Sequence, residues 1–191
     1  MKVLVACESS ERVKKQLLSR GHDAHSCDLL LGEQGLPNHH QCDVRELLQD
    51  RWDMMIAFPP CTYLANSGVR WLHERPDRWE NMIKGAEFFR MLLQASIPLI
   101  AIENPIPHRY AVEVIGRKYD QIVQPWMFGH GEVKATCFWL KGLSLLKPTQ
   151  IVEGRFPRVW KEPPSAERWR NRSRTYEGIA EAMAIQWGGN L

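Results

Sequence analysis

A single cysteine stands directly after two prolines in the stretch 56-IAFPPCTYLANSG-68. The apolar run before it predicts a buried strand that delivers Cys61 into a turn stiffened by Pro59 and Pro60. A cysteine needed only for packing could sit anywhere in a core, whereas a nucleophile must be held at a strand end over an open cleft. Because a thiolate is a strong, soft nucleophile, this placement makes Cys61 a candidate catalytic residue.

A second strand-like run, 97-IPLIAIENP-105, ends in the acid–amide–proline sequence Glu103-Asn104-Pro105. A carboxyl group buried at a strand end can stay protonated and donate a hydrogen bond to a ring nitrogen. Cys61 and Glu103 together could therefore attack an electron-poor heterocycle and stabilise the adduct. The alternative makes Cys61 a small buried hydrophobic residue and Glu103 a salt-bridged surface acid. The matching positions of the two residues at strand ends favour the chemical interpretation.

The elements that must position these residues alternate between strand and helix. The expected strands cover residues 2–6, 23–27, 52–58, 97–105, 121–125 and 136–140. The expected helices run from a cap at Ser9 or Ser10 to about residue 20, and over residues 78–95 and 178–187. This alternation predicts an α/β fold, a mostly parallel sheet with helices on both faces. Such sheets bind ligands beyond the carboxyl ends of their strands, so we expect the site at that edge.

Polar residues also follow the first strands of this sheet: Cys7, Glu8 and Ser9, then Asp28, and later Asp43. Carboxylates at successive strand ends can bind the ribose hydroxyls and the adenine amino group of a nucleoside cofactor. The first turn reads ACESSER and lacks the G-x-G-x-x-G loop that cradles a pyrophosphate. The pattern therefore favours a cofactor with an amino-acid tail, such as S-adenosylmethionine, bound near a helix N-terminus. Helix capping is the alternative role for Asp28.

The composition of the 191 residues, 44% hydrophobic and 25% charged, predicts one globular domain over residues 1–191. No apolar run approaches the roughly 18 residues that a membrane span needs, so we expect no membrane contact. The amino-terminal apolar run is too short for a signal peptide, which predicts a cytoplasmic protein. The five cysteines are odd in number and widely spread, and we expect free thiols.

The segment 155-RFPRVWKEPPSAERWRNRSR-174 combines basic residues with Trp160 and Trp169. A basic stretch interleaved with aromatic residues suits a polyanion whose bases can stack on it. The alternative is a solvated surface tail whose tryptophans pack on the body of the protein. Composition alone leaves both interpretations open.

These features resemble the DNA cytosine-5 methyltransferases. Pro60-Cys61 resembles the nucleophile motif of that family, and Glu103-Asn104 resembles the pair that holds the Watson–Crick edge of the cytosine, with Pro105 where valine is commoner. The chain is most similar, over nearly its whole length, to short phage and prophage members. The resemblance implies the Rossmann-like fold of S-adenosylmethionine-dependent methyltransferases.

The resemblance also implies roles for residues elsewhere in the chain. Asp28 falls on the ribose-binding acid, Asp43 on the adenine-binding aspartate, and 176-YEGIAEAMAIQWG-188 on the closing cofactor motif without its asparagine. Lys134 falls on the first arginine of the segment that braces the catalytic loop, and Thr136 on the second. The implied catalytic residues are Cys61, Glu103, Asn104 and Lys134. The implied cofactor-binding residues are Ala6, Cys7, Glu8, Ser9, Asp28, Asp43, Pro59, Gly178 and Ile179. The implied nucleic-acid-binding residues are Lys134, Trp160, Arg168, Arg170, Arg172 and Arg174.

The implied reaction is methyl transfer from S-adenosylmethionine to carbon 5 of a cytosine flipped out of DNA, most simply duplex DNA. Cys61 adds to ring carbon 6 while Glu103 donates to ring nitrogen 3. Carbon 5 then takes the methyl group and loses its proton. Only 35 residues, 141–175, separate the bracing segment from the closing motif. They can hold a basic, tryptophan-containing arm but no separate target-recognition domain, which implies short or relaxed sequence specificity.

Two other classes of function fit parts of the sequence. The spacing of His22, His25, Cys27, His39, His40 and Cys42 could suit zinc. No pair of C-x-x-C motifs supports that, and we expect no metal ion. A catalytically silent nucleic-acid-binding module is the second alternative, and the basic segment fits it equally well. RNA or free nucleotides could also be substrates of the same chemistry.

Overall fold

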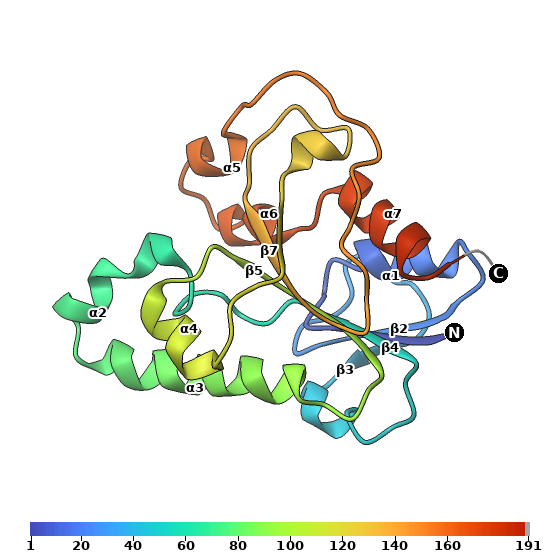
Figure 1. Ribbon diagram of the computed structural model, residues 1–191, viewed down its shortest axis with the longest axis horizontal. Coiled ribbons are helices and arrows are strands. Elements are labelled where there is room, and N and C mark those ends of the chain that lie inside the picture. Colours follow the sequence, from blue (N-terminus) through green and yellow to red (C-terminus); the bar gives the residue numbers. More distant parts are fainter. Residues whose placement is uncertain (190–191) are drawn as a thin grey trace.

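A seven-stranded sheet forms the centre of the computed structural model, which describes residues 1–189 (Figure 1). The strands are β1 (Lys2–Ala6), β2 (Asp23–Asp28), β3 (His39–Gln41), β4 (Met54–Ala57), β5 (Leu99–Pro105), β6 (Gln121–Val123) and β7 (Thr136–Lys141). Their order across the sheet is β3-β2-β1-β4-β5-β7-β6. Residues 190–191 of the predicted domain lie outside the described residues.

The direction of the strands brings their polar ends to one edge. β1 to β5 are parallel to one another, whereas β7 runs antiparallel to both of its neighbours, β5 and β6. Pro105 at the carboxyl end of β5 therefore pairs with Thr136 at the amino end of β7. The strand order reverses between β1 and β4, which is the switch point where open α/β sheets bind ligands.

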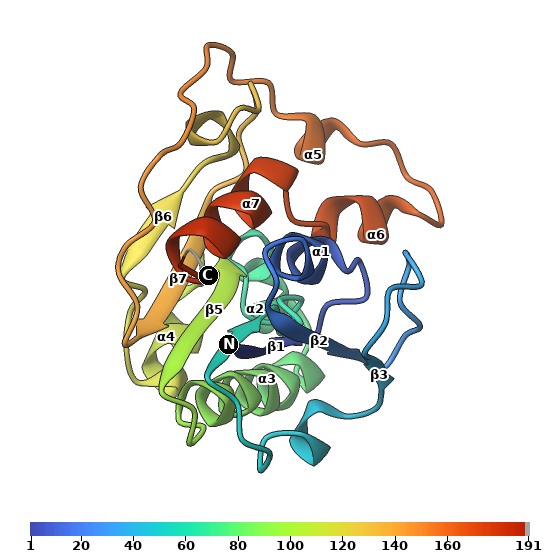
Figure 2. The ribbon, with the colours of Figure 1, turned by 90° about the vertical axis from the view of Figure 1, so that its right-hand side faces the viewer.

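Helices cover both faces of the sheet (Figure 2). α1 (Arg12–Leu18) and α7 (Glu177–Gln186) lie on one face, and α3 (Asp77–Leu93) and α4 (Arg109–Ile115) lie on the other. The shorter helices are α2 (Arg70–Glu74), α5 (Arg158–Lys161) and α6 (Arg168–Ser173), with 3₁₀ turns at Val44–Glu46, Asn66–Gly68 and Pro125–Met127. None of the helices within residues 1–189 is long and apolar enough to cross a lipid bilayer.

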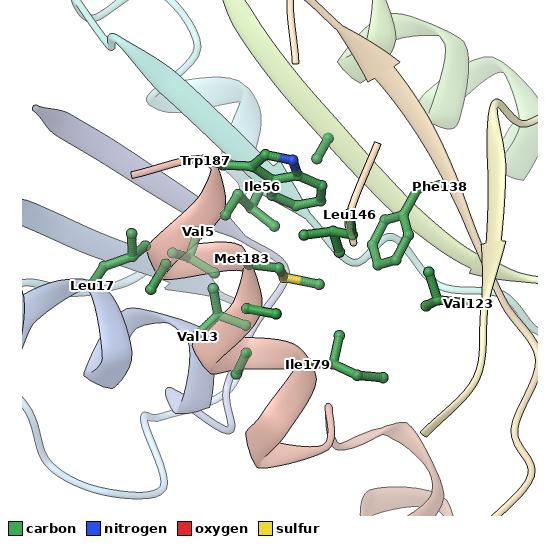
Figure 3. Close-up of a cluster of buried hydrophobic side chains, with 14 of the residues drawn as sticks. Val5, Val13, Leu17, Ile56, Val123, Phe138, Leu146, Ile179, Met183 and Trp187 are labelled. Carbon is green, nitrogen blue, oxygen red and sulfur yellow. The ribbon is translucent and has the colours of Figure 1, made fainter. Parts of the chain in front are cut away.

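The two hydrophobic cores follow from side chains that alternate along each strand. Val5 of β1 and Ile56 of β4 face α1 and α7, where they pack with Leu17 and Met183 (Figure 3). The intervening residues Leu4, Met55 and Ala57 face α3 instead. Strands buried on both faces explain why their sequences are continuously apolar rather than alternating.

The sequence-based prediction of an α/β sheet with helices on both faces is confirmed. Each of the six expected strands is present with ends shifted by two residues or fewer, as are the helices expected over 78–95 and 178–187. β3, α2, α4, α5 and α6 were not anticipated. These elements are three to seven residues long, too short to establish a hydrophobic period.

The expected serine cap of the first helix is wrong. α1 begins at Arg12, and its N-cap residue Glu11 has left-handed backbone angles and makes no side-chain capping bond. The carboxylate of Glu8 caps the helix instead, accepting hydrogen bonds from the backbone N–H of Val13 at 2.8 Å and of Lys14 at 3.4 Å. A carboxylate binds these N–H groups more strongly than a hydroxyl because it also complements the helix dipole.

Residues 141–175 pack along the body of the protein and include α5 and α6 (Figure 2). Val159 of α5 is buried in the core shared with α7, and Phe156 pairs with Glu132 in a parallel bridge. The side chains of Trp160 and Trp169 remain 76% and 54% exposed. The backbone of this basic arm is therefore docked, while its two tryptophans face solvent.

Gly178 should be intolerant of a side chain. A Cβ atom there would lie 1.9 Å from the carbonyl oxygen of Phe128, so α7 would have to move away from the core. We expect Gly178→Ala to lower the free energy of unfolding by roughly 2 kcal/mol or more in urea denaturation.

The matched control is Gly85→Ala in α3, where the nearest atom to an added Cβ is a Leu64 methyl at 3.6 Å. Alanine favours the helical backbone, so we expect this variant to be unchanged or stabilised by up to about 1 kcal/mol. Equal stabilities of the two variants would contradict the close approach of α7 to Phe128.

Candidate active site

The Cys61 loop begins where β4 ends. Pro59 is buried and Pro60 exposed, and the carbonyl oxygen of Cys61 accepts the backbone N–H groups of Leu64 at 3.0 Å and Ala65 at 2.9 Å. These two bonds close a tight turn directly after the cysteine. The half-buried side chain of Cys61 thus projects from a turn that is constrained by the two prolines before it and by these two hydrogen bonds after it.

Bonds to the segment after β5 fix the far side of this loop. The N–H of Asn66 donates to the carbonyl of Ile106 at 2.8 Å, and the N–H of His108 donates to the carbonyl of Leu64 at 3.0 Å. The buried ring of His108 accepts the N–H of Ala111 at Nδ1 and lies 2.9 Å through Nε2 from the carbonyl of Tyr63. Since Nδ1 accepts, Nε2 carries the proton and donates it to Tyr63.

Sequence reasoning missed His108. Burial lowers the pKa of its ring, which keeps the neutral tautomer that both bonds require. The signal in the sequence is a histidine at the cap position of a short helix, three residues after Pro105. That signal is weak because helices of this length show little periodicity.

Glu103 and Asn104 point to opposite faces of the sheet because they are adjacent on β5. Glu103 has the same parity as Ala101, which faces α7, whereas Asn104 has the parity of Ile102, which faces α3. Asn104 is 1% exposed; its Nδ2 donates to the carbonyl of Pro105 at 2.6 Å, and its Oδ1 is buried without a hydrogen-bond partner. Glu103 therefore lies on the face of α1 and α7, and its charge raises the pKa of the Cys61 thiol.

Lys134 reaches the same edge because β7 is antiparallel and starts there. It lies two residues before Thr136, and its backbone N–H is held by Oε1 of Gln124 at 3.0 Å. The charge of Lys134 shifts the pKa of both Cys61 and Glu103, so the three side chains lie close to one another. The structure thus brings together Cys61, Glu103 and Lys134 from three separate elements.

Burial dominates the protonation of this group. It raises the pKa of the Glu103 carboxyl, against a smaller opposing effect of Lys134. It also raises the pKa of the Cys61 thiol, and the nearby Glu103 raises it further, whereas Lys134 and Arg172 lower it. Cys61 is consequently a thiol, not a thiolate, in the free protein at neutral pH.

Arg172 is a neighbour of this group from the docked arm. It lies on α6, and its charge lowers the pKa of both Cys61 and Lys134. Its Nε is buried without a hydrogen-bond partner, and its side chain makes no ion pair within the described residues. This guanidinium group is therefore available to a ligand beside Cys61.

The first turn is occupied by its own side chains. Cys7 has a positive φ of 58°, a conformation that glycine adopts more easily, and burial raises the pKa of its thiol to about 12. Glu8 is 4% exposed and, besides capping α1, accepts the Ser10 hydroxyl at 3.1 Å. The N–H groups of Val13 and Lys14, at the helix N-terminus where a charged cofactor tail is expected, are bound by Glu8.

The two carboxylates expected to hold a nucleoside differ in availability. Asp28 accepts the N–H of Leu30 through Oδ1 at 2.9 Å, and its Oδ2 makes no hydrogen bond within residues 1–189. Asp43 caps the 3₁₀ turn after β3 and binds Arg45 through both oxygens, at 2.9 Å and 2.7 Å. The charges of both aspartates raise the pKa of the Cys7 thiol, which indicates that both lie near Cys7. Asp28 thus keeps a free oxygen for a ribose hydroxyl.

The other residues expected to bind the cofactor take part in packing or in backbone hydrogen bonds of the protein itself. Ala6 is buried in the sheet, and the carbonyl of Ser9 accepts the N–H of Glu33 at 2.8 Å. The N–H of Gly178 donates to His130 Nε2 at 3.1 Å, and Ile179 is a core residue, 2% exposed. The last two lie at the start of α7, in packing positions.

The basic arm is fastened over the first turn by ion pairs. Glu33 binds Arg170 Nε at 3.2 Å and Arg174 Nη2 at 2.8 Å. Lys134 Nζ donates to the carbonyl of Arg174 at 3.4 Å. Arg168 donates to the carbonyl of Glu162 at 2.8 Å. Of the arm arginines predicted to contact nucleic acid, Arg170 and Arg174 are thus already paired with an acid, and Arg172 is not.

Two cavities flank this contact. The larger, of about 590 Å³, is lined by Ser10, Arg12, Leu31, Glu33, Gln34, Arg170, Arg174 and Glu177. The smaller, of about 110 Å³, is lined by Arg12, Arg158, Val159, Asn171, Arg174 and Tyr176. Both lie where the first turn meets the arm, beside the residues expected to hold a cofactor and a nucleic acid.

The histidines and cysteines considered for zinc form pairs. His25 Nδ1 lies 2.9 Å from His40 Nε2, and the sulfur atoms of Cys27 and Cys42 lie 3.8 Å apart. His39 binds the Ser26 hydroxyl, and His22 lies near the amino terminus. Across residues 1–189, no three or more His, Cys, Asp or Glu residues are grouped so that they could hold a metal ion.

Comparison with known proteins shows the fold. The chain is similar to a candidate DNA modification methyltransferase encoded within a prophage of E. coli, with 14% identity, a TM-score of 0.51 and coverage of 86% of this chain and 56% of that one. A methyltransferase of Entamoeba histolytica is aligned at 11% identity and a TM-score of 0.49, with coverage of 86% and 61%. The chain thus spans less than two thirds of the length of either protein. No protein-family profile and no curated protein sequence matches it. The sheet and its helices have the Rossmann-like fold of S-adenosylmethionine-dependent methyltransferases.

The buried Glu8 should make stability depend on pH. Burial raises the pKa of its carboxyl to about 7, so between about pH 4.5 and 7 the folded protein binds a proton that the unfolded chain has released. Stability from this group is present below pH 4.5 and is lost as the pH rises through 7, by roughly 3 kcal/mol at most. We expect the Glu8→Gln substitution to remove this decline in the free energy of unfolding. Urea denaturation at a series of pH values measures it.

The control is Glu113→Gln, which removes an exposed carboxyl group on α4. Its profile should run parallel to that of the unmodified protein. A Glu8→Gln profile that is also parallel would show that Glu8 is ionised when buried.

Proposed function

We propose that this chain transfers a methyl group from S-adenosylmethionine to carbon 5 of cytosine in DNA through a covalent Cys61 adduct. The observation that carries the proposal is the meeting of Cys61, Glu103 and Lys134 at the carboxyl edge of the sheet. A nucleophile, a protonated carboxyl and a cation are the groups that addition to an electron-poor ring requires.

In this mechanism Cys61 must lose its proton when the substrate binds. Its pKa is raised in the free protein, so the thiolate forms only as the cleft closes around the base. Lys134 and Arg172 stabilise the thiolate because both lower that pKa. The sulfur then bonds to ring carbon 6, and the electron pair of the 5,6 double bond moves toward carbon 5.

Glu103 supplies the balancing proton. Burial raises the pKa of its carboxyl, which favours the protonated form, and donation of that proton to ring nitrogen 3 neutralises the charge that addition creates. S-adenosylmethionine, when bound, supplies the electrophilic methyl group for carbon 5. A water molecule then takes the carbon-5 proton, and the electrons of that C–H bond re-form the 5,6 double bond as the Cys61 sulfur leaves carbon 6 as a thiolate. Ring nitrogen 3 returns its proton to Glu103, which restores both the ring and the carboxyl group. Asn104 acts through the backbone of this strand end, where its side chain binds the carbonyl of Pro105.

The residues of the first strands fit a nucleoside cofactor in part. Asp28 offers a free carboxylate oxygen at the switch point between β1 and β4, where Cys7, Ser9 and Pro59 line the strand ends. These residues would bind the ribose and position the cofactor. With Glu8 capping α1, the tail of the cofactor must find its partners elsewhere.

DNA is the proposed substrate because the arm beside the site is basic and carries exposed aromatic rings. A base must leave the duplex to reach a half-buried cysteine. The 76% exposed ring of Trp160 suits stacking with bases, and Arg172 suits a phosphate or a base edge. The arm of residues 141–175 is short, which favours short or relaxed sequence specificity.

A catalytically silent nucleic-acid-binding module is the second candidate. The observations that favour it are the Glu8 carboxylate at the α1 N-terminus and the raised pKa of Cys61. Both are what a methyltransferase fold without a working cofactor site would show. The chemistry of the first proposal would apply equally to cytosine in RNA or in free nucleotides.

Methylation can be tested directly. The protein is incubated with S-adenosylmethionine and unmethylated duplex DNA, the DNA is digested, and 5-methyldeoxycytidine is measured by mass spectrometry. We expect product from the unmodified protein and a loss on the order of 10³-fold or more for Cys61→Ser, because a serine hydroxyl is a far weaker nucleophile at neutral pH. Thr62→Ala, which truncates the adjacent exposed side chain, is the matched control and should retain activity.

Product from Cys61→Ser at the unmodified rate would rule out the covalent adduct. No product from any variant, under conditions where S-adenosylmethionine binds, would exclude duplex DNA as the substrate. Single-stranded DNA and RNA are then assayed in the same way, and their failure would leave the silent module.

A further inference from the structure

Three arginines from distant parts of the sequence line the smaller cavity. Arg12 comes from α1, Arg158 from α5, and Arg174 directly follows α6. The remaining lining side chains are Val159, Asn171 and Tyr176, so no carboxylate lines this space of about 110 Å³. Neither Arg12 nor Arg158 was singled out by the sequence.

Each arginine is anchored by a carboxylate that lies outside the lining. Arg12 Nε is 3.4 Å from Glu177, Arg158 Nε is 2.8 Å from Glu132, and Arg174 Nη2 is 2.8 Å from Glu33. The acids hold the guanidinium groups in place without filling the cavity. This arrangement holds three guanidinium-bearing residues around one space, which is the prerequisite of a preorganised anion site.

Donor groups remain for a ligand. Arg12 uses Nη1 for the carbonyl of Thr175 at 2.7 Å, and its Nη2 makes no hydrogen bond within the described residues. Arg158 uses Nε and Nη2, the latter toward the Tyr176 hydroxyl at 3.3 Å, and its Nη1 is likewise unused within residues 1–189. Arg174 donates to Asn171 Oδ1 at 3.0 Å, so it contributes its positive charge to the cavity rather than an unused donor.

We propose that this cavity binds a phosphate group. A tetrahedral dianion or diester would accept hydrogen bonds from the two unused guanidinium nitrogens and be attracted by the three positive charges around the cavity. Arginine suits this role because its guanidinium group carries several donors, so that one nitrogen can bind the anchoring acid while another stays unused for the ligand.

The phosphate would lie next to the candidate active site. Arg158 lies close enough to Lys134 to lower its pKa, and Lys134 Nζ donates to the carbonyl of Arg174. On the proposed function, which this step assumes, the bound group is a backbone phosphate of the strand whose cytosine reaches Cys61. The cavity therefore selects nucleotides and polynucleotides over the free nucleoside.

Binding of inorganic phosphate to the full chain tests the site without any methylation. It is measured by titration calorimetry and by the rise in Tm. We expect saturable binding that weakens at least about tenfold in Arg12→Gln and in Arg158→Gln. Arg158→Lys keeps the charge but loses the fork and should fall between these variants and the unmodified protein. The charge-matched control Arg51→Gln lies before β4, at the opposite edge of the sheet, and should bind normally.

Competition identifies the source of the phosphate. Deoxycytidine monophosphate and a short oligonucleotide should displace inorganic phosphate, whereas deoxycytidine should not. Absence of saturable binding, or equal weakening by Arg51→Gln, would overturn the site. Unchanged binding in the folded Arg12→Gln and Arg158→Gln variants would overturn it as well.

The assay also separates the two proposals. Phosphate binding that needs Arg12 and Arg158, in a protein that yields no methylated product, supports the cavity and counts against methyl transfer. Methylation that proceeds normally in Arg158→Gln, together with unchanged phosphate binding, supports methyl transfer and removes the cavity.

Discussion

The antiparallel pairing of β7 with β5 determines where the polar chemistry of this chain collects. In a fully parallel sheet, the residues that precede β7 would lie at the amino edge, far from the Cys61 loop. Reversal of this one strand brings Lys134 to the carboxyl edge, where β4 and β5 deliver Cys61 and Glu103. Backbone hydrogen bonds fix the register of β5 and β7, and this register sets where Glu103 and the residues before β7 lie.

That meeting places titratable groups where water is scarce. An isolated buried charge is costly, and burial accordingly raises the pKa of both Glu103 and Cys61, which favours their neutral forms. Burial lowers the pKa of Lys134, and only an ionised Glu103 or Cys61 opposes that shift. Burial thus favours the neutral form of each of these three groups in the free protein.

The docked arm, residues 141–175, covers part of this edge of the sheet. Glu33 holds Arg170 and Arg174 over the first turn, and the buried Val159 fixes α5 in the core. Partly exposed ion pairs contribute little to stability, so the core contact carries the docking and the ion pairs set its orientation. Arg172 is left without such a partner, which explains why one basic segment can hold both structural and ligand-directed arginines.

The sequence by itself determined the α/β class, the six longer strands and the placement of Cys61 and Glu103 at strand ends, because apolar runs and the turn residues after them are local signals. It could not determine the direction of β7, the helix cap at Glu8, or the role of His108 in holding the Cys61 loop. Those features depend on contacts between residues far apart in the chain. Only the tertiary structure decided which arm arginine lies free beside Cys61, because ion pairing depends on distance in space rather than on order along the sequence.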